Sequence, residues 1–167
     1  MKKLFFISII VFQGTFLFAQ EFQVPTNYNL VKVEDYAPYE QDVLNCIKWL
    51  TDVPVDQNIQ KRKEANAFLM KWMIGSPDLK IEIRPDIVNF VSNPEMLMAF
   101  MCGWTKYSLE TRDFSNQIKG NIAGIENTIL VYNKNKKAIG EDKNVEKWSK
   151  LQSKGTLEKE IAKILSK

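Results

Sequence analysis

The chain has 167 residues, with 23 Lys and Arg against 20 Asp and Glu, and it contains no histidine. The missing imidazole excludes serine–histidine–acid and cysteine–histidine nucleophiles and histidine-ligated zinc, and two cysteines are too few for an all-cysteine zinc site or an iron–sulfur cluster. The net charge of +3 is no clear basic excess, so we expect no nucleic-acid partner. We also expect no cofactor.

Residues 1–19 have the features of a secretory signal peptide. Lys2 and Lys3 form a basic start, residues 4–12 are apolar apart from one serine, and Ala19 is the best cleavage point. No cysteine follows the cut to carry a lipid, and the apolar stretch is shorter than the about 20 residues of a membrane span. We therefore expect export to the periplasm or the extracellular medium, with no stable membrane anchor after signal cleavage.

Residues 20–36 are predicted to form an extended leader, and residues 37–167 a single helical domain. Apolar residues alternate weakly in residues 30–33 and strictly in residues 79–83. Strict alternation is typical of a strand. We therefore allow for one minor two-stranded β element that pairs these two segments.

Three helices are predicted in the first half of this domain. Residues 38–51 carry one apolar stripe at helical spacing, formed by Val43, Cys46, Ile47 and Leu50. A second helix is expected from an N-cap at Asp56 to residue 74, because Gly75 and a following proline are a clear helix end. A short third helix is expected over residues 85–91.

A buried helix over residues 94–111 is the predicted centre of the fold. Asn93 is a preferred N-cap, Pro94 suits the first helical position, and Glu95 complements the positive helix end. Residues 96–104 are apolar all round. A helix of this kind that is too short to span a bilayer must be enclosed by other helices.

The most regular pattern follows in residues 114–132, with apolar side chains at steps of three and four residues. Gly120 and Gly124 interrupt this helix, and each costs about 1 kcal/mol of helix propensity. We expect a close crossing with the central helix near Gly103 to offset this cost. A ligand or a bend at the glycines is the alternative.

Two shorter helices are predicted at the end of the chain, the first around Val145, Trp148 and Leu151 and the second after a cap at Thr156. Residues 134–167 contain ten Lys against five acidic residues. We interpret this charge run as solvated helix faces, with contact to an anionic surface as the alternative. The fold class is thus mainly α, a single compact bundle of about six to seven helices around the buried helix 94–111.

Carboxylates and sulfur atoms are the remaining candidates for chemistry. Two carboxylates at a fixed distance can cleave glycans, and the acids considered are Glu95, Glu110, Asp113 and Glu126. Met96, Met98, Met101 and Cys102 have the soft ligands that Cu(I) prefers. Met96 and Met98 lie about 200° apart on a helix, however, which favours core packing.

Cys46 and Cys102 are both predicted to face inward, and export would permit a disulfide between them. Such a bond would contribute about 4 kcal/mol in the chain-entropy model. Two buried free thiols are the equal alternative.

No motif in the chain fixes a reaction or a ligand, and no catalytic, cofactor or metal residue is assigned. We expect an exported, soluble helical domain that acts as a non-enzymatic binding or interaction protein, with an unknown protein or an apolar ligand as its partner. The alternatives are a small carboxylate-dependent hydrolase acting on glycan or peptide, and a carrier of an apolar ligand built on the methionine-rich helices.

Overall fold

The computed structural model describes residues 22–167, so the predicted signal peptide lies outside the described residues. Within them the chain is mainly helical and contains no strand. The 3-10 helices are η1 (Val33–Asp35) and η2 (Ala37–Tyr39), and the α-helices are α1 (Glu40–Asp52), α2 (Ile59–Gly75), α3 (Pro94–Thr111), α4 (Gln117–Ile139), α5 (Lys143–Ser153) and α6 (Leu157–Leu165). The predicted helical bundle is confirmed.

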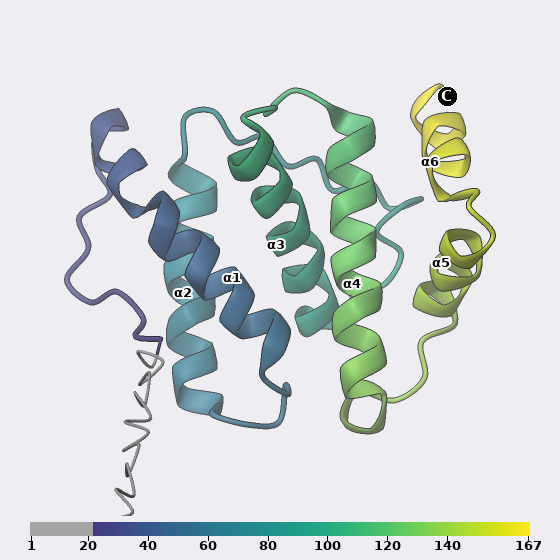
Figure 1. Cartoon of the computed structure of the whole chain (residues 1–167), viewed down its shortest axis with the longest axis horizontal. Coiled ribbons are helices and arrows are strands. Elements are labelled where there is room, and N and C mark those ends of the chain that lie inside the picture. Colours follow the sequence, from purple (N-terminus) through teal and green to yellow (C-terminus); the bar gives the residue numbers. More distant parts are fainter. Residues whose placement is uncertain (1–21) are drawn as a thin grey trace, which may run out of the picture.

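Helix α3 is the central element, with α1 and α2 on one side and α4 followed by α5 and α6 on the other (Figure 1). Its start follows the sequence signals, because the Asn93 side chain accepts hydrogen bonds from the backbone N–H of Glu95 at 3.1 Å and of Met96 at 3.4 Å. Arg112 ends the helix in the left-handed region, at φ 58°. No helix in the described part of the chain combines the length and apolar character needed to cross a membrane.

Helices α3 and α4 cross closely, as the glycines predict. A Cβ added to Gly124 would lie 2.6 Å from the Phe100 ring, and one added to Gly120 would overlap the Trp104 ring. One added to Gly103 would meet the backbone oxygen of Ala123. The glycines of α4 therefore make room for aromatic rings of α3, and Gly103 lies against Ala123 rather than pairing with either of them.

The predicted two-stranded element is not formed among the described residues, and residues 79–83 belong to an irregular loop. The two segments lie on different sides of the bundle (Figure 1). Tyr36, the last residue of the leader, accepts a bond at its backbone oxygen from Trp72 in α2. Ile87 in the loop accepts one from Trp148 in α5. The alternation in residues 79–83 instead places Leu79 in the core.

The predicted short helix over residues 85–91 is also absent. This segment forms turns, in which the backbone N–H groups of Ile87 and Val88 both donate to the Arg84 carbonyl. The turns are fixed from outside, because the side chain of Asn144 donates to the Asn89 carbonyl at 2.9 Å. Contacts with α5 therefore replace the helical hydrogen bonds here.

Three helix starts differ in detail from the prediction. Helix α2 begins after Asn58 rather than Asp56, since the connector before it is tied to α4 by the Val55 backbone N–H, which donates to Asn135 at 2.9 Å. Phe114 precedes α4, which starts at residue 117. Thr156 occupies the N-cap position of α6 without a side-chain cap bond, because its hydroxyl donates to the Leu151 carbonyl.

Candidate binding groove

A surface groove of about 540 Å³ lies where the leader meets the exposed side of α1. Its volume is in the range of ligand sites in proteins. Its described lining residues come from the leader and α1, and they are Phe22, Gln23, Asp42, Asn45, Lys48, Trp49 and Asp52.

Two aromatic rings form one wall of the groove. The Phe22 and Trp49 rings are 5.8 Å apart between centroids, with an angle of 35° between their planes. The Lys61 ammonium lies 5.5 Å from the Phe22 centroid and 5.4 Å from the Trp49 centroid. A cation at this distance is attracted by the ring quadrupole, so the aromatic pair is suited to bind positive charge.

The two aspartates of the groove differ in their partners. Asp52 accepts bonds from Lys48 at 2.6 Å and Lys134 at 3.1 Å, and these ammonium groups lower the pKa of its carboxyl. Asp42 lies in the first turn of α1, where its charge complements the helix dipole. The Asp42 carboxylate makes no hydrogen bond or ion pair with another described residue. It is therefore the acidic group of the groove that is available to a ligand.

Two of the four candidate carboxylates are used in structural contacts. Glu95 accepts a bond at 3.1 Å from the buried Arg62 guanidinium, which also donates to the Val53 carbonyl at 2.6 Å. Asp113 accepts a bond from the Tyr107 hydroxyl at 3.0 Å, which lowers the pKa of its carboxyl. Both acids stabilise the fold.

The other two candidate carboxylates, Glu110 and Glu126, share a surface groove of about 310 Å³ between α3 and α4. Glu110 lies 3.8 Å from Lys106, and both side chains are more than half exposed. All the carboxyl pKa shifts that the structure supports are downward, at Asp35, Asp52, Asp86, Asp113 and Glu146. A raised pKa, which a catalytic acid needs, is not among them.

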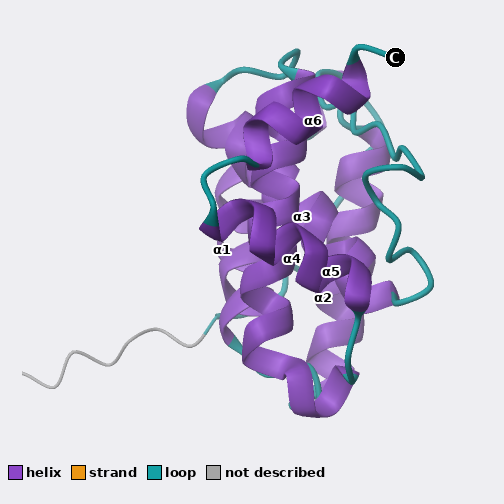
Figure 2. Cartoon of the chain, turned by 90° about the vertical axis from the view of Figure 1, so that its right-hand side faces the viewer, coloured by secondary structure: helices purple, strands orange, loops and turns teal. Residues whose placement is uncertain are grey.

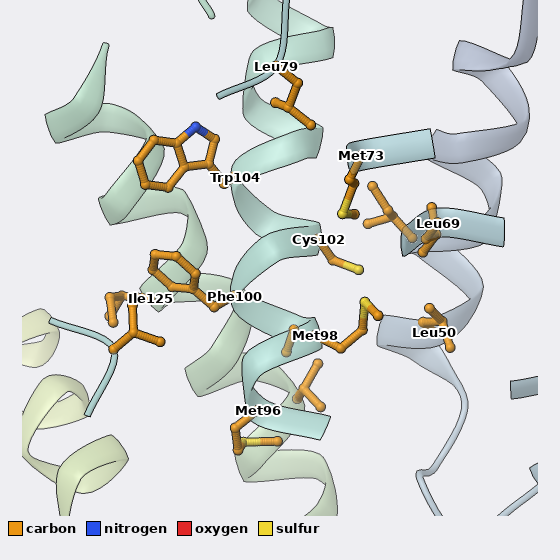
Figure 3. Packing of buried hydrophobic residues seen from close by; sticks show 14 of the residues in the cluster. Leu50, Leu69, Met73, Leu79, Met96, Met98, Phe100, Cys102, Trp104 and Ile125 are labelled. Atoms are coloured by element: carbon orange, nitrogen blue, oxygen red, sulfur yellow. The ribbon is translucent and has the colours of Figure 1, made fainter. Parts of the chain in front are cut away.

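Met96, Met98 and Cys102 are buried in the core, and Met101 is half-buried against it. Met98 and Cys102 point from α3 toward Leu50 and Met73, while Met96 points in another direction (Figure 3). The cavity beside Met98 and Cys102 has a volume of about 10 Å³, which is room for about one water molecule and no apolar ligand. The described residues contain no cluster of three or more histidine, cysteine or acidic groups placed to hold a metal ion.

Cys46 and Cys102 are both buried free thiols. Burial raises the pKa of Cys46 to about 12, and it raises that of Cys102 as well. The Cys46 thiol donates to the Ala65 carbonyl at 3.7 Å. Neither thiol has the lowered pKa of a reactive cysteine.

Sequence reasoning did not identify Phe22 and Trp49 as site residues. A signal was present in α1, because Trp49 lies at the edge of the stripe of Val43, Cys46, Ile47 and Leu50, where a large ring is only partly buried. The position of Phe22 depends on how the leader folds back, which no local pattern describes. No known protein family, curated protein or solved structure matches the chain.

Proposed function

We propose that the chain is an exported, non-enzymatic interaction domain that binds a partner protein through the groove of Phe22, Asp42 and Trp49. The observation that carries the proposal is the aromatic pair beside Asp42, an acid without a hydrogen-bond or ion-pair partner among residues 22–167. Trp and other aromatic side chains supply much of the energy at the centres of protein interfaces. The groove therefore has an anchor and a polar contact on one helix face.

The preferred partner segment carries a basic side chain next to an apolar one. Asp42 and the rings of Phe22 and Trp49 would both attract the basic group, and the rings would also contact the apolar group. The place of the Lys61 ammonium beside both rings supports this chemistry. Partner residues of this kind would have to compete with Lys61 for the aromatic surface.

A photo-crosslinking amino acid at Asn45, which is exposed and lines the groove, tests the proposal in living cells. We expect an adduct with a specific protein that is lost in the Asp42→Asn variant. The control carries the same amino acid at Lys137, an exposed position on α4, and should give no such adduct. An adduct pattern that is the same at both positions, or unaffected by Asp42→Asn, would refute the groove as the binding site.

Export is the second part of the proposal. It is supported by the basic start and the apolar stretch of residues 1–19. Cleavage after Ala19 would place the new α-amino group on Gln20, two residues before Phe22 in the sequence. Mass spectrometry of the exported protein should give an N-terminus at Gln20, and recovery of the uncleaved chain from the membrane fraction would contradict this.

A carboxylate-dependent hydrolase is the second candidate, favoured only by the shared groove of Glu110 and Glu126. Glu110 is more than half exposed and lies beside Lys106, so it lacks the apolar surroundings of a catalytic proton donor. Hydrolysis of a glycan or peptide that disappears in both Glu110→Gln and Glu126→Gln would establish this function in place of the first.

A further inference from the structure

The solvent-facing side of α5 and its C-cap residue carry a row of four exposed lysines, which we call the lysine row: Lys143, Lys147, Lys150 and Lys154. They follow one another at intervals of four, three and four residues. This spacing places them on one helix face over about 16 Å. Together with Glu146 and Leu151 they line a surface groove of about 510 Å³.

Within the described residues, no lysine of the row has an ion-pair partner. The only acid in the groove lining is Glu146, and its carboxylate is held by Lys136 at 2.6 Å and by the Tyr132 hydroxyl at 3.1 Å. Like charges three and four residues apart destabilise a helix. A bound chain of anionic groups would relieve this repulsion.

The rest of α5 indicates which anion fits. Its apolar residues Val145 and Trp148 are buried, and Leu151 is half-buried against the core, so α5 has no continuous apolar face to enter a bilayer. With Trp148 buried, the row also offers no aromatic surface for stacking nucleic-acid bases. The remaining feature is a line of charges along a groove, which matches an extended polymer with regularly spaced anionic groups.

We propose that the lysine row binds a linear acidic polysaccharide. Helix α5 lies on the opposite side of the molecule from α1 (Figure 1), on the side that Figure 2 presents to the viewer. A partner protein at α1 and a polysaccharide at α5 therefore need not compete. The inference goes beyond the proposed interaction with a partner protein and does not depend on it.

The test uses the full exported chain and two probes, a sulfated heparin octasaccharide and a carboxylated oligogalacturonate of the same length. The Lys147→Gln/Lys150→Gln variant removes two charges from the row, and Lys159→Gln/Lys163→Gln removes two exposed charges from α6. We expect the first variant to lose about tenfold in affinity for at least one probe and to lower the salt dependence of binding by about two ions, because each lysine contact releases about one counterion. The second variant should stay within about twofold of the wild type.

Three results would overturn the proposal. The first is no measurable binding of either probe at low salt, and the second is an equal loss in both variants, which would reflect net charge alone. The third is tighter binding of single-stranded DNA or anionic phospholipid vesicles than of either saccharide at equal charge. Binding of heparin alone or of oligogalacturonate alone would support the proposal and identify sulfate or carboxylate as the preferred group.

Discussion

Helices α3 and α4 pack closely because glycines at their crossing leave room for neighbouring rings and backbone. Helices α5 and α6, in contrast, contact the rest of the molecule partly through an irregular loop. At the crossing, Gly120 and Gly124 accept the rings of Trp104 and Phe100. At the loop, side chains of α5 bind backbone carbonyl groups, as in the 3.1 Å bond from the Trp148 indole to Ile87.

The two regions are stabilised by different kinds of interaction. The crossing buries apolar surface between two helices that already satisfy their own backbone hydrogen bonds. Residues 76–93 have no ladder of their own. Side chains of α5 therefore donate to their carbonyl groups, and the α6 carbonyl of Ile164 accepts a bond from the loop residue Arg84. Adding side-chain atoms to a glycine should weaken the crossing of α3 and α4. Removing a hydrogen-bond donor of α5 should weaken its contact with the loop.

Replacing Trp148 with Ala should have the largest effect, a loss of about 3 to 5 kcal/mol in the free energy of unfolding. The variant removes a fully buried ring and the donor to Ile87. Hydrogen exchange should show that protection falls most in residues 76–93 and in α5 and α6. The thiols of Cys46 and Cys102 should stay unreactive, because they lie in the other region, and an equal loss of protection in α3 would show that the two regions unfold as one.

Replacing Gly124 with Leu should overpack the crossing and cost about 1 to 3 kcal/mol. The same prediction holds for Gly120, since both positions lie against aromatic rings. Asn133→Leu is the matched control. This position on α4 is exposed, so the higher helix propensity of Leu should raise the free energy of unfolding by about 0.3 kcal/mol. A higher denaturant midpoint for the glycine variants would mean that the crossing does not need their small size.

Replacing Glu95 with Gln tests the polar contact between α2 and α3 and should cost about 1.5 to 3 kcal/mol, the range for a hydrogen bond to a charged group. The Arg62 side chain is only 5% exposed and would keep its carbonyl acceptors but lose its carboxylate partner. Urea unfolding of Glu110→Gln provides the control, because the exposed pair with Lys106 should change stability by less than about 0.5 kcal/mol. Equal costs in both variants would contradict a special role for the buried pair.

Replacing Asp52 with Asn should have the smallest effect, visible in the pH dependence of stability. Lys48 and Lys134 lower the pKa of Asp52 below its ordinary value of 3.8 in the folded protein. The carboxylate therefore stabilises the fold above that value, and this contribution is lost as the pH falls through the lower folded-state pKa. Thermal unfolding should show a lower midpoint for the variant than for the wild type at about pH 7 and no difference between them at about pH 2. A difference of the same size at both pH values would mean that the effect does not come from the charge of Asp52.

The same contrast explains how much could be predicted from the sequence. Helix α3 was predicted with its bounds because Asn93, Pro94 and Glu95 are local signals, and the close crossing followed from the glycine spacing. The segment between α2 and α3 was misread as a strand and a helix, since its conformation depends on α5 and α6. The groove was missed for a related reason, because Phe22 reaches Trp49 only after the leader folds back along α1.

The loop contacts also bear on the order of folding. The bonds that fix residues 76–93 join partners 55, 61 and 80 residues apart in the chain, the longest of them from Arg84 to the Ile164 carbonyl. Contacts of such long range are slow to form, because the intervening chain must first give up its freedom. A chain that emerges N-terminus first can assemble α1 to α4 early, yet the segment between α2 and α3 acquires its last partner only when residue 164 arrives. We therefore expect refolding to end with this internal segment, long after the helices on either side of it have formed.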